Sequence, residues 1–242
     1  MAGTTTAAAP PSYFLPLMQL CDSALPIGAF SHSFGLETYL ERGAVHDEAT
    51  FVRWLRQFIG AQLVYSDGLA IRLGVEALER AVPNPAALED VWELDRMVTA
   101  QALPLQLRAA GITMGQRMLQ IGTEIFPNPA LAAYRAEISA GRCAGHTALA
   151  FVLIAHGLRV PPAQMLQAYI FSTATSLTQN AVRAIPLGQS AGQRVLRLVH
   201  DDVAAAAAAV MALQPEDLGA VAPGLEIAQM RHEHQRARMF MS

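Results

Sequence analysis

Apolar side chains recur at helical spacing along most of the chain. The clearest case follows Asp47, where large apolar residues occupy the i, i+3, i+4, i+7 and i+8 positions: Phe51, Trp54, Leu55, Phe58 and Ile59. Asp47 is a favourable N-cap, so this pattern predicts an amphipathic helix whose apolar face lies in the core. No stretch shows several β-branched segments that alternate at period two, as strands would. The pattern predicts an all-α protein built as a single compact multi-helix domain of about ten helices.

Proline and glycine mark where these helices are expected to begin and end. Pro-Asn-Pro occurs twice, at 83–85 and 127–129, and each is expected to end one helix and open the next. Pro104 is expected to separate two helices, and Gly141 to close the helix that begins after 127–129. The expected helices cover residues 47–59, 67–81, 85–101, 105–121, 129–140, 145–156, 161–184, 190–213, and from Pro223 almost to the C-terminus. The helix over 145–156 is apolar nearly all round, which predicts that it lies at the centre of the domain.

The first eleven residues, M-A-G-T-T-T-A-A-A-P-P, indicate a disordered tail (1–11) ahead of an all-α domain over 12–242. They lack the positive start and the long apolar segment of a signal peptide, and no apolar run is long enough to cross a bilayer. A cytoplasmic location is therefore expected.

Cys21 and Cys143 have no C-x-x-C spacing and are expected to be free thiols.

Composition excludes several classes of chemistry. All 17 basic residues are arginine, so the chain has no lysine for a Schiff base or for a P-loop. The net charge of −3 argues against a nucleic-acid-binding surface. Hydrophobic residues make up 52% of the chain and charged residues only 15%, which predicts an apolar surface that a partner covers.

Ser31, His32 and Ser33 follow the Leu-Pro-Ile-Gly turn of residues 25–28 and raise the question of a catalytic cluster. Adjacent residues on a helical turn point about 100° apart, which does not align a nucleophile with its base. A serine N-cap on a helix that Gly43 closes explains the same residues. The structural interpretation is therefore favoured over the catalytic one.

The sequence His200-Asp201-Asp202 is a candidate metal site, with His146 and His156 as possible further ligands. Such a site would suit an all-α metal-dependent hydrolase that uses His200-Asp201, and this hydrolase is the alternative function. The ligands would have to be assembled from separate helices without a supporting motif. Solvent-facing carboxylates ahead of an alanine-rich helix are the simpler interpretation.

Two other segments are better explained by contacts than by catalysis. The segment His232-Glu233-His234 does not have the spacing of an H-E-x-x-H motif. Its two histidines would point about 200° apart on a helix, so they could share a metal ion only across a dimer. Residues 183–193, R-A-I-P-L-G-Q-S-A-G-Q, have glycines near a helix start, but no lysine and no preceding strand, so the P-loop interpretation fails. Arg183 and the glutamines of this segment are available to bond a neighbouring chain.

Three blocks of the sequence resemble the signatures of the UreF family of urease accessory proteins. The blocks comprise Leu25, Pro26, Ile27, Gly28, Phe30, Ser33, Gly35, Leu36 and Glu37; Arg183, Ala184, Pro186, Leu187, Gly188, Gln189, Gly192 and Gln193; and His232, Gln235, Arg238, Phe240 and Ser242. They occur in the order of the family. Between them, over residues 45–170, the match lies mainly in helical pattern and length.

The resemblance implies an all-α, homodimeric scaffold rather than an enzyme. In this family the protein bridges UreH (also called UreD) to the GTPase UreG, modulates that GTPase, and belongs to a complex that delivers nickel to apo-urease. The expected partners are therefore UreH (UreD), UreG and apo-urease, without nucleic acid or membrane. No cofactor is expected to bind tightly, because nickel is handled by the complex.

The resemblance also implies which residues bind partners. They are Phe30, Ser33, Glu37, Arg183, Gln189, Gln193, His232, Gln235, Arg238 and Phe240. Phe30 is expected to be an exposed aromatic on a rigid turn, where family members often have tyrosine. Arg238 and Phe240 are expected to contact UreH through a tail that orders only on binding.

Overall fold

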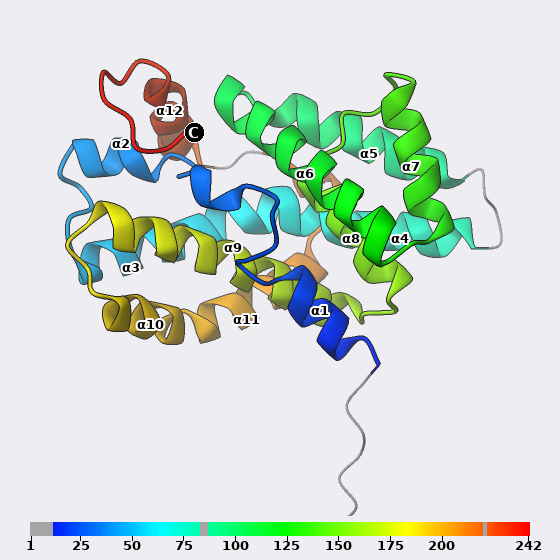
Figure 1. Ribbon diagram of the computed structural model, residues 1–242, viewed down its shortest axis with the longest axis horizontal. Coiled ribbons are helices and arrows are strands. Elements are labelled where there is room, and N and C mark those ends of the chain that lie inside the picture. Colours follow the sequence, from blue (N-terminus) through cyan, green and yellow to red (C-terminus); the bar gives the residue numbers. More distant parts are fainter. Residues whose placement is uncertain (1–11, 83–86, 220–221) are drawn as a thin grey trace, which may run out of the picture.

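The computed structural model describes residues 12–82, 87–219 and 222–242, and over these ranges it contains helices and connecting segments but no strand (Figure 1). The all-α prediction is confirmed, whereas the tail expected at 1–11 lies outside the described residues. No helix in the described ranges is long and apolar enough to cross a membrane. The elements are α1 (Phe14–Leu20), η1 (Ala29–Ser31), α2 (Leu36–Glu41), α3 (Glu48–Gln57), the π-helix η2 (Phe58–Gly68), α4 (Leu69–Ala81), α5 (Leu88–Gln101), α6 (Leu105–Ile125), α7 (Pro129–Ser139), α8 (Thr147–Gly157), α9 (Pro162–Ala184), α10 (Gln189–Leu198), α11 (His200–Ala212), η4 (Pro215–Asp217) and α12 (Pro223–His232).

One continuous helical run, made of α3, η2 and α4, spans the molecule from α3 on the left of Figure 1 to α4 on the right. Asp47 begins it with the predicted cap, since its carboxylate accepts from the Thr50 amide at 2.8 Å. The sequence predicted two separate helices here. They are joined by the wide turns of η2, in which Gly68 lies so near the Leu63 carbonyl that a Cβ would approach that oxygen to 2.7 Å.

The centre of the domain is α8, as predicted, because its residues 147–155 are all buried. Glycines let its neighbours approach closely. A Cβ on Gly74 of α4 would meet Val152 Cγ1 at 3.0 Å, and one on Gly122 of α6 would meet Ile154 Cδ1 at 2.4 Å. Larger residues at these two positions would separate the helices, so small residues set the packing of this half of the fold.

A buried carboxylate fixes the chain where it enters α8. Asp95 of α5 is fully buried and accepts from the Tyr134 hydroxyl at 2.6 Å and from the amides of Ala144 and His146 at 2.6 and 2.8 Å. Burial, followed by the nearby Asp95 charge, raises the pKa of Tyr134 well above its ordinary value, so the hydroxyl keeps the proton that it donates. This cluster ties α5 and α7 to the start of α8.

Most of the predicted helix ends are confirmed. Gln101 ends α5 and Leu105 begins α6 on either side of Pro104. Asn128 caps α7 through its side chain, with Pro129 in the first turn, and Gly141 has a φ of +72° just past the end of that helix. The first Pro-Asn-Pro lies outside the described residues.

Two predictions about the last third of the chain are wrong. The helix expected over 190–213 is divided into α10 and α11 at Val199, a fully buried residue that ends one helix and precedes the next. The final helix does not continue to the C-terminus, because α12 ends at His232 and the chain then folds back onto α2 (Figure 1).

Truncating Trp54 should destabilise the fold. Its side chain is 8% exposed and stacks on Phe51 and Phe58 at centroid distances of 6.1 and 5.3 Å. We expect Trp54→Ala to lower the free energy of unfolding by about 3–5 kcal/mol, measured by urea denaturation followed by circular dichroism. Arg53→Ala, on the exposed side of the same helix, is the control and should change it by less than about 0.5 kcal/mol.

Candidate partner-docking site

The docking loop, residues 25–35, presents an aromatic side chain to solvent. Gly28 has a φ of +89°, a left-handed conformation that favours glycine, and it begins the short helix η1. Phe30 lies in this helix with 64% of its surface exposed. The exposure predicted for Phe30 is confirmed, and the Pro-Ile-Gly turn is the local reason for it.

The serines and the histidine of this loop hold structure together. The Ser33 hydroxyl accepts from the Glu37 amide at 3.3 Å, which satisfies a donor in the first turn of α2. His32 Nδ1 lies 2.9 Å from the Ser242 hydroxyl, and burial lowers the pKa of His32, which favours a neutral ring. These bonds support a structural use of Ser31-His32-Ser33, but the predicted serine N-cap is wrong, because Gly35 takes the N-cap position of α2.

The C-terminal strap, residues 233–242, lies along this loop. The Met241 amide donates to the Ser31 carbonyl at 2.7 Å, and the Ser33 amide donates to the Ser242 carbonyl at 2.5 Å. The prediction of a tail that orders only on binding is wrong, since the backbone of the strap already forms hydrogen bonds with the docking loop. These bonds replace the i to i−4 bonds that a longer α12 would have made.

One carboxylate organises the strap. Glu37 in the first turn of α2 accepts from the amides of Met239 and Phe240 at 2.5 and 3.1 Å, and from His232 Nε2 at 2.8 Å. Because a carboxylate only accepts, it places a proton on Nε2 of the imidazole. The opposite ring nitrogen, Nδ1, lies 2.7 Å from Gln106 Oε1, so His232 also links α12 to α6.

Helix α9 supports the loop and the strap from beneath. Asn180 is fully buried and donates from Nδ2 to the His32 carbonyl at 2.7 Å. Arg183 donates to the Phe30 carbonyl at 3.1 Å and places its guanidinium over the Phe240 ring, 5.3 Å from the ring centre. Arg183 therefore holds the two parts of the site together while its side chain remains at the surface.

The structure divides the predicted partner-binding residues into two groups. Side chains at the surface belong to Phe30, Arg183, Gln189, Gln193 and Arg238, with Glu37 and Gln235 partly covered. Ser33 and His232 are fully buried and Phe240 is 5% exposed, so these three stabilise the site from within, and their prediction as direct partner contacts is corrected. Gln235 bonds Thr38 and Glu41 on α2, which is a further attachment of the strap.

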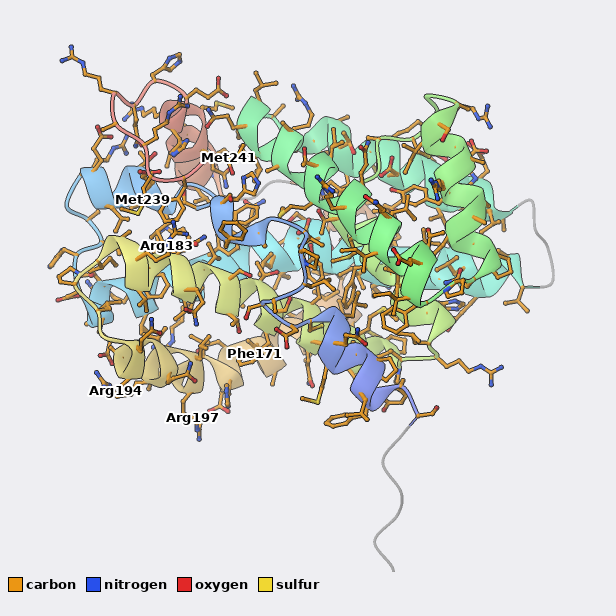
Figure 2. The ribbon with its side chains drawn as sticks, in the orientation of Figure 1. Phe171, Arg183, Arg194, Arg197, Met239 and Met241 are labelled. Carbon is orange, nitrogen blue, oxygen red and sulfur yellow. The ribbon has the colours of Figure 1, made fainter. Side chains whose placement is uncertain are left out.

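Two surface residues of the strap were missed by the sequence reasoning. Met239 and Met241 are 55% and 67% exposed, on either side of the buried Phe240 (Figure 2). The alternation in M-F-M was the available signal, because an extended segment turns every second side chain to the same side.

Three of the five candidate metal ligands have structural roles, and Asp201 lies at the surface. The His200 ring packs against Phe171 at 5.5 Å, Asp202 accepts from Arg56 at 3.0 Å, and His146 accepts from the Ala148 amide as the cap of α8. Among the described residues, no group of three or more His, Cys, Asp or Glu side chains is placed to hold a metal ion. His232 and His234 diverge as predicted, since His232 is buried and His234 is exposed.

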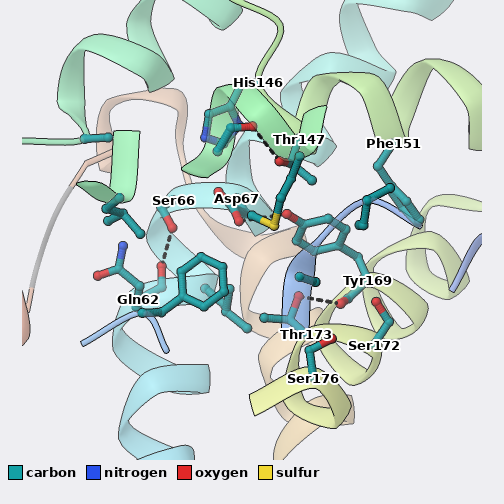
Figure 3. Close-up of a pocket in the computed structure, with 18 of the residues that line it drawn as sticks. Gln62, Ser66, Asp67, His146, Thr147, Phe151, Tyr169, Ser172, Thr173 and Ser176 are labelled. Carbon is teal, nitrogen blue, oxygen red and sulfur yellow. Dashed lines mark hydrogen bonds between the residues drawn. The ribbon is translucent and has the colours of Figure 1, made fainter. Parts of the chain in front are cut away.

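A cavity of about 130 Å³ lies beneath the docking loop, where η2, α8 and α9 meet (Figure 3). Its wall includes Asp22, Asp67 and Glu226 but no arginine, so it suits neutral or cationic species better than anions. Tyr169 donates to Asp67 at 2.8 Å, and burial followed by the Asp67 charge raises the Tyr169 pKa.

The two cysteines are free thiols, as predicted. Cys21 lies in the cavity wall, where burial raises the pKa of its thiol to about 12, and burial likewise raises that of Cys143 to about 12. Neither thiol therefore ionises appreciably near neutral pH. This excludes thiolate nucleophiles from the chemistry of the site.

Comparison with known proteins gives consistent matches. The UreF family profile matches residues 45–200. The urease accessory protein UreF of Arthrobacter sp. (strain FB24) is 61% identical over 235 residues, which cover 97% of this chain and 100% of that protein. Those of Paenarthrobacter aurescens (strain TC1) and Corynebacterium efficiens are 56% and 47% identical, covering 96% and 94% of this chain and 99% and 96% of theirs.

Glu37→Gln should loosen the strap while the helical core stays folded. The substitution removes the charge that three donors share, and hydrogen bonds to charged groups are the stronger ones. We expect the Met239 and Phe240 amides to exchange their hydrogens at least about tenfold faster, a change of about 1.4 kcal/mol in local opening. Glu41→Gln is the matched control, because Glu41 bonds only the side chain of Gln235 in the strap. Equal exchange rates in the wild type and Glu37→Gln would contradict the role assigned to Glu37.

Proposed function

Because this chain belongs to the UreF family of urease accessory proteins, which are non-catalytic, we propose that it acts in urease maturation as a scaffold. In this proposal it bridges UreH (UreD) to the GTPase UreG and modulates GTP-dependent delivery of nickel to apo-urease in the cytoplasm. The metal-dependent hydrolase is rejected, because His200 is packed against Phe171 and the family is not enzymatic.

The observation that carries the proposal is a surface of exposed side chains on a rigidly held segment. We define the docking face as Phe30, Arg183, Arg238, Met239 and Met241, all at the surface. Apolar aromatic and thioether groups with flanking arginines are the composition enriched at protein interfaces. Because the backbone beneath them is fixed by Glu37, Asn180 and Arg183, little conformational freedom is lost on binding. These properties support docking of UreH (UreD) at this face.

Modulation of UreG requires contact without nucleotide chemistry. The chain has no lysine, so hydrolysis of GTP is assigned to UreG and not to this protein. A scaffold changes the activity of a bound GTPase by binding one of its conformations more tightly than the other. Gln189 and Gln193 at the exposed start of α10 are candidates for this contact. Nickel is the cargo of the assembled complex.

We also propose that the chain forms a homodimer through α1. Phe14, Leu15 and Met18 expose 47%, 70% and 56% of their surfaces on the outer side of this helix, while Leu17 and Leu20 attach it to the core. Three large apolar groups on one short helix are a surface that a second copy would cover.

Leu15→Glu should therefore dissociate the dimer. A charge placed in an apolar interface is desolvated without a partner, so we expect sedimentation at the monomer rate with unchanged helicity. Leu103→Glu, which alters a residue 58% exposed elsewhere, should leave the dimer intact. A Leu15→Glu protein that sediments with the wild type would place the interface on another surface.

Association with partners tests the scaffold and the docking face together. The wild-type protein should co-purify with UreH (UreD) and, through that complex, with UreG, and should hydrolyse no nucleotide alone.

Arg238→Ala should weaken association with UreH at least about tenfold while leaving thermal stability unchanged, because this arginine lies at the surface. Arg135→Ala, on the exposed side of α7, is the control and should bind normally. The absence of all pairwise and ternary association would reject the scaffold, and a large loss of stability in Arg238→Ala would place Arg238 in the fold instead.

A further inference from the structure

The strap presents two methionine sulfurs on the docking face, in a segment whose backbone does not depend on them. The Met239 amide is held by Glu37, and the Met241 amide by the Ser31 carbonyl, while the Phe240 ring between them is buried against Arg183. Figure 2 places Met239, Met241 and Arg183 on the same half of the molecule. The thioether side chains therefore project outward from a fixed support.

The exposure of methionines differs strongly across the fold. Met114, Met118 and Met165 are at most 5% exposed, whereas Met241 is 67% exposed. A hydroperoxide needs access to the sulfur lone pair, so the buried sulfurs react only when the fold opens. Met211 on α11, with 46% exposure, is accessible like Met239 but lies outside the docking face and outside the surface proposed for the dimer, which makes it a suitable reference.

We propose that Met239 and Met241 are a reversible oxidation site that controls partner docking. Hydrogen peroxide transfers one oxygen atom to each thioether sulfur, so that the sulfur is oxidised to the sulfoxide and the peroxide is reduced to water. The product is polar and strongly hydrated, while the backbone bonds that hold the strap are unchanged. Oxidation therefore converts the apolar centre of the docking face into a polar one without releasing the strap.

This inference rests on the proposed function, because it requires that a partner cover the two methionines. The docking face determines the chemistry of that partner. The partner presents an apolar protein surface, and each side chain that this surface covers loses its contact with water. Desolvating two sulfoxides in place of two thioethers should weaken association by about tenfold or more. Reduction by a methionine sulfoxide reductase with a dithiol returns the thioethers, with one water and one disulfide formed for each sulfoxide.

The test compares oxidised and reduced full-length protein in binding to purified UreH (UreD). Protein treated with hydrogen peroxide at neutral pH is mapped by peptide mass spectrometry, and its dissociation constant is measured by calorimetry. The Met239→Leu/Met241→Leu variant keeps an apolar face that cannot be oxidised, and Met211→Leu is the matched control. We expect about tenfold weaker binding by oxidised wild type and oxidised Met211→Leu, no change in oxidised Met239→Leu/Met241→Leu, and recovery after treatment with the reductase.

Each other result overturns the inference. Unchanged binding after both sulfurs carry oxygen would reject it and leave the scaffold function intact. An equal loss of binding by the oxidised double-leucine variant would assign the effect to another residue. If reduced wild-type protein does not bind UreH at all, then the proposed function fails and the inference fails with it. Circular dichroism of each oxidised sample shows whether the loss comes from unfolding, and unfolding would also reject control by surface polarity.

Discussion

The acceptance of three donors by the Glu37 carboxylate is the interaction on which the docking face depends. Met239 and Phe240 donate from the backbone and His232 from its ring, so one side chain of α2 fixes the end of α12 and the strap. The Glu37 side chain is only 13% exposed, which limits competition by water for these donors. Without this anchor the strap would keep only its weaker attachments, such as the pairing of Met241 with Ser31, and part of the ordering cost would fall on the binding step.

The same reasoning explains why this site suits the proposed docking role better than catalysis. Its polar side chains are already engaged with one another: His32 with Ser242, Asn180 with the loop backbone, and Arg183 with Phe30 and Phe240. A catalytic group must instead be free to exchange a proton or an electron pair with a substrate. The side chains left free at the surface are apolar or cationic, and these bind a protein better than they transform a small molecule.

The sequence predicted those parts of the fold that short-range interactions determine. The cap at Asp47, the breaks at Pro104 and Asn128, and the apolar helix over 145–156 each depend on residues within a few positions of one another. The division at Val199 and the continuity through η2 depend on packing between helices, which no local pattern records. For the site, the exposure of Phe30 could be predicted from its turn, but the strap could not, because its bonds to Glu37 span 202 and 203 residues.

This difference between local and long-range bonds also determines how the docking face responds to a change in the strap. The central helix α8 is buried on all sides, so it opens only with the whole fold, whereas the strap is held by a small number of bonds at the surface. Changes at the strap would therefore alter the proposed partner binding at little cost to the core. Since Asn180 holds the docking loop through the His32 carbonyl and not through the strap, loosening of the strap would remove contacts to a partner without releasing the whole loop. The fold thereby separates the stability of the core from the strength of the contacts proposed for the docking face.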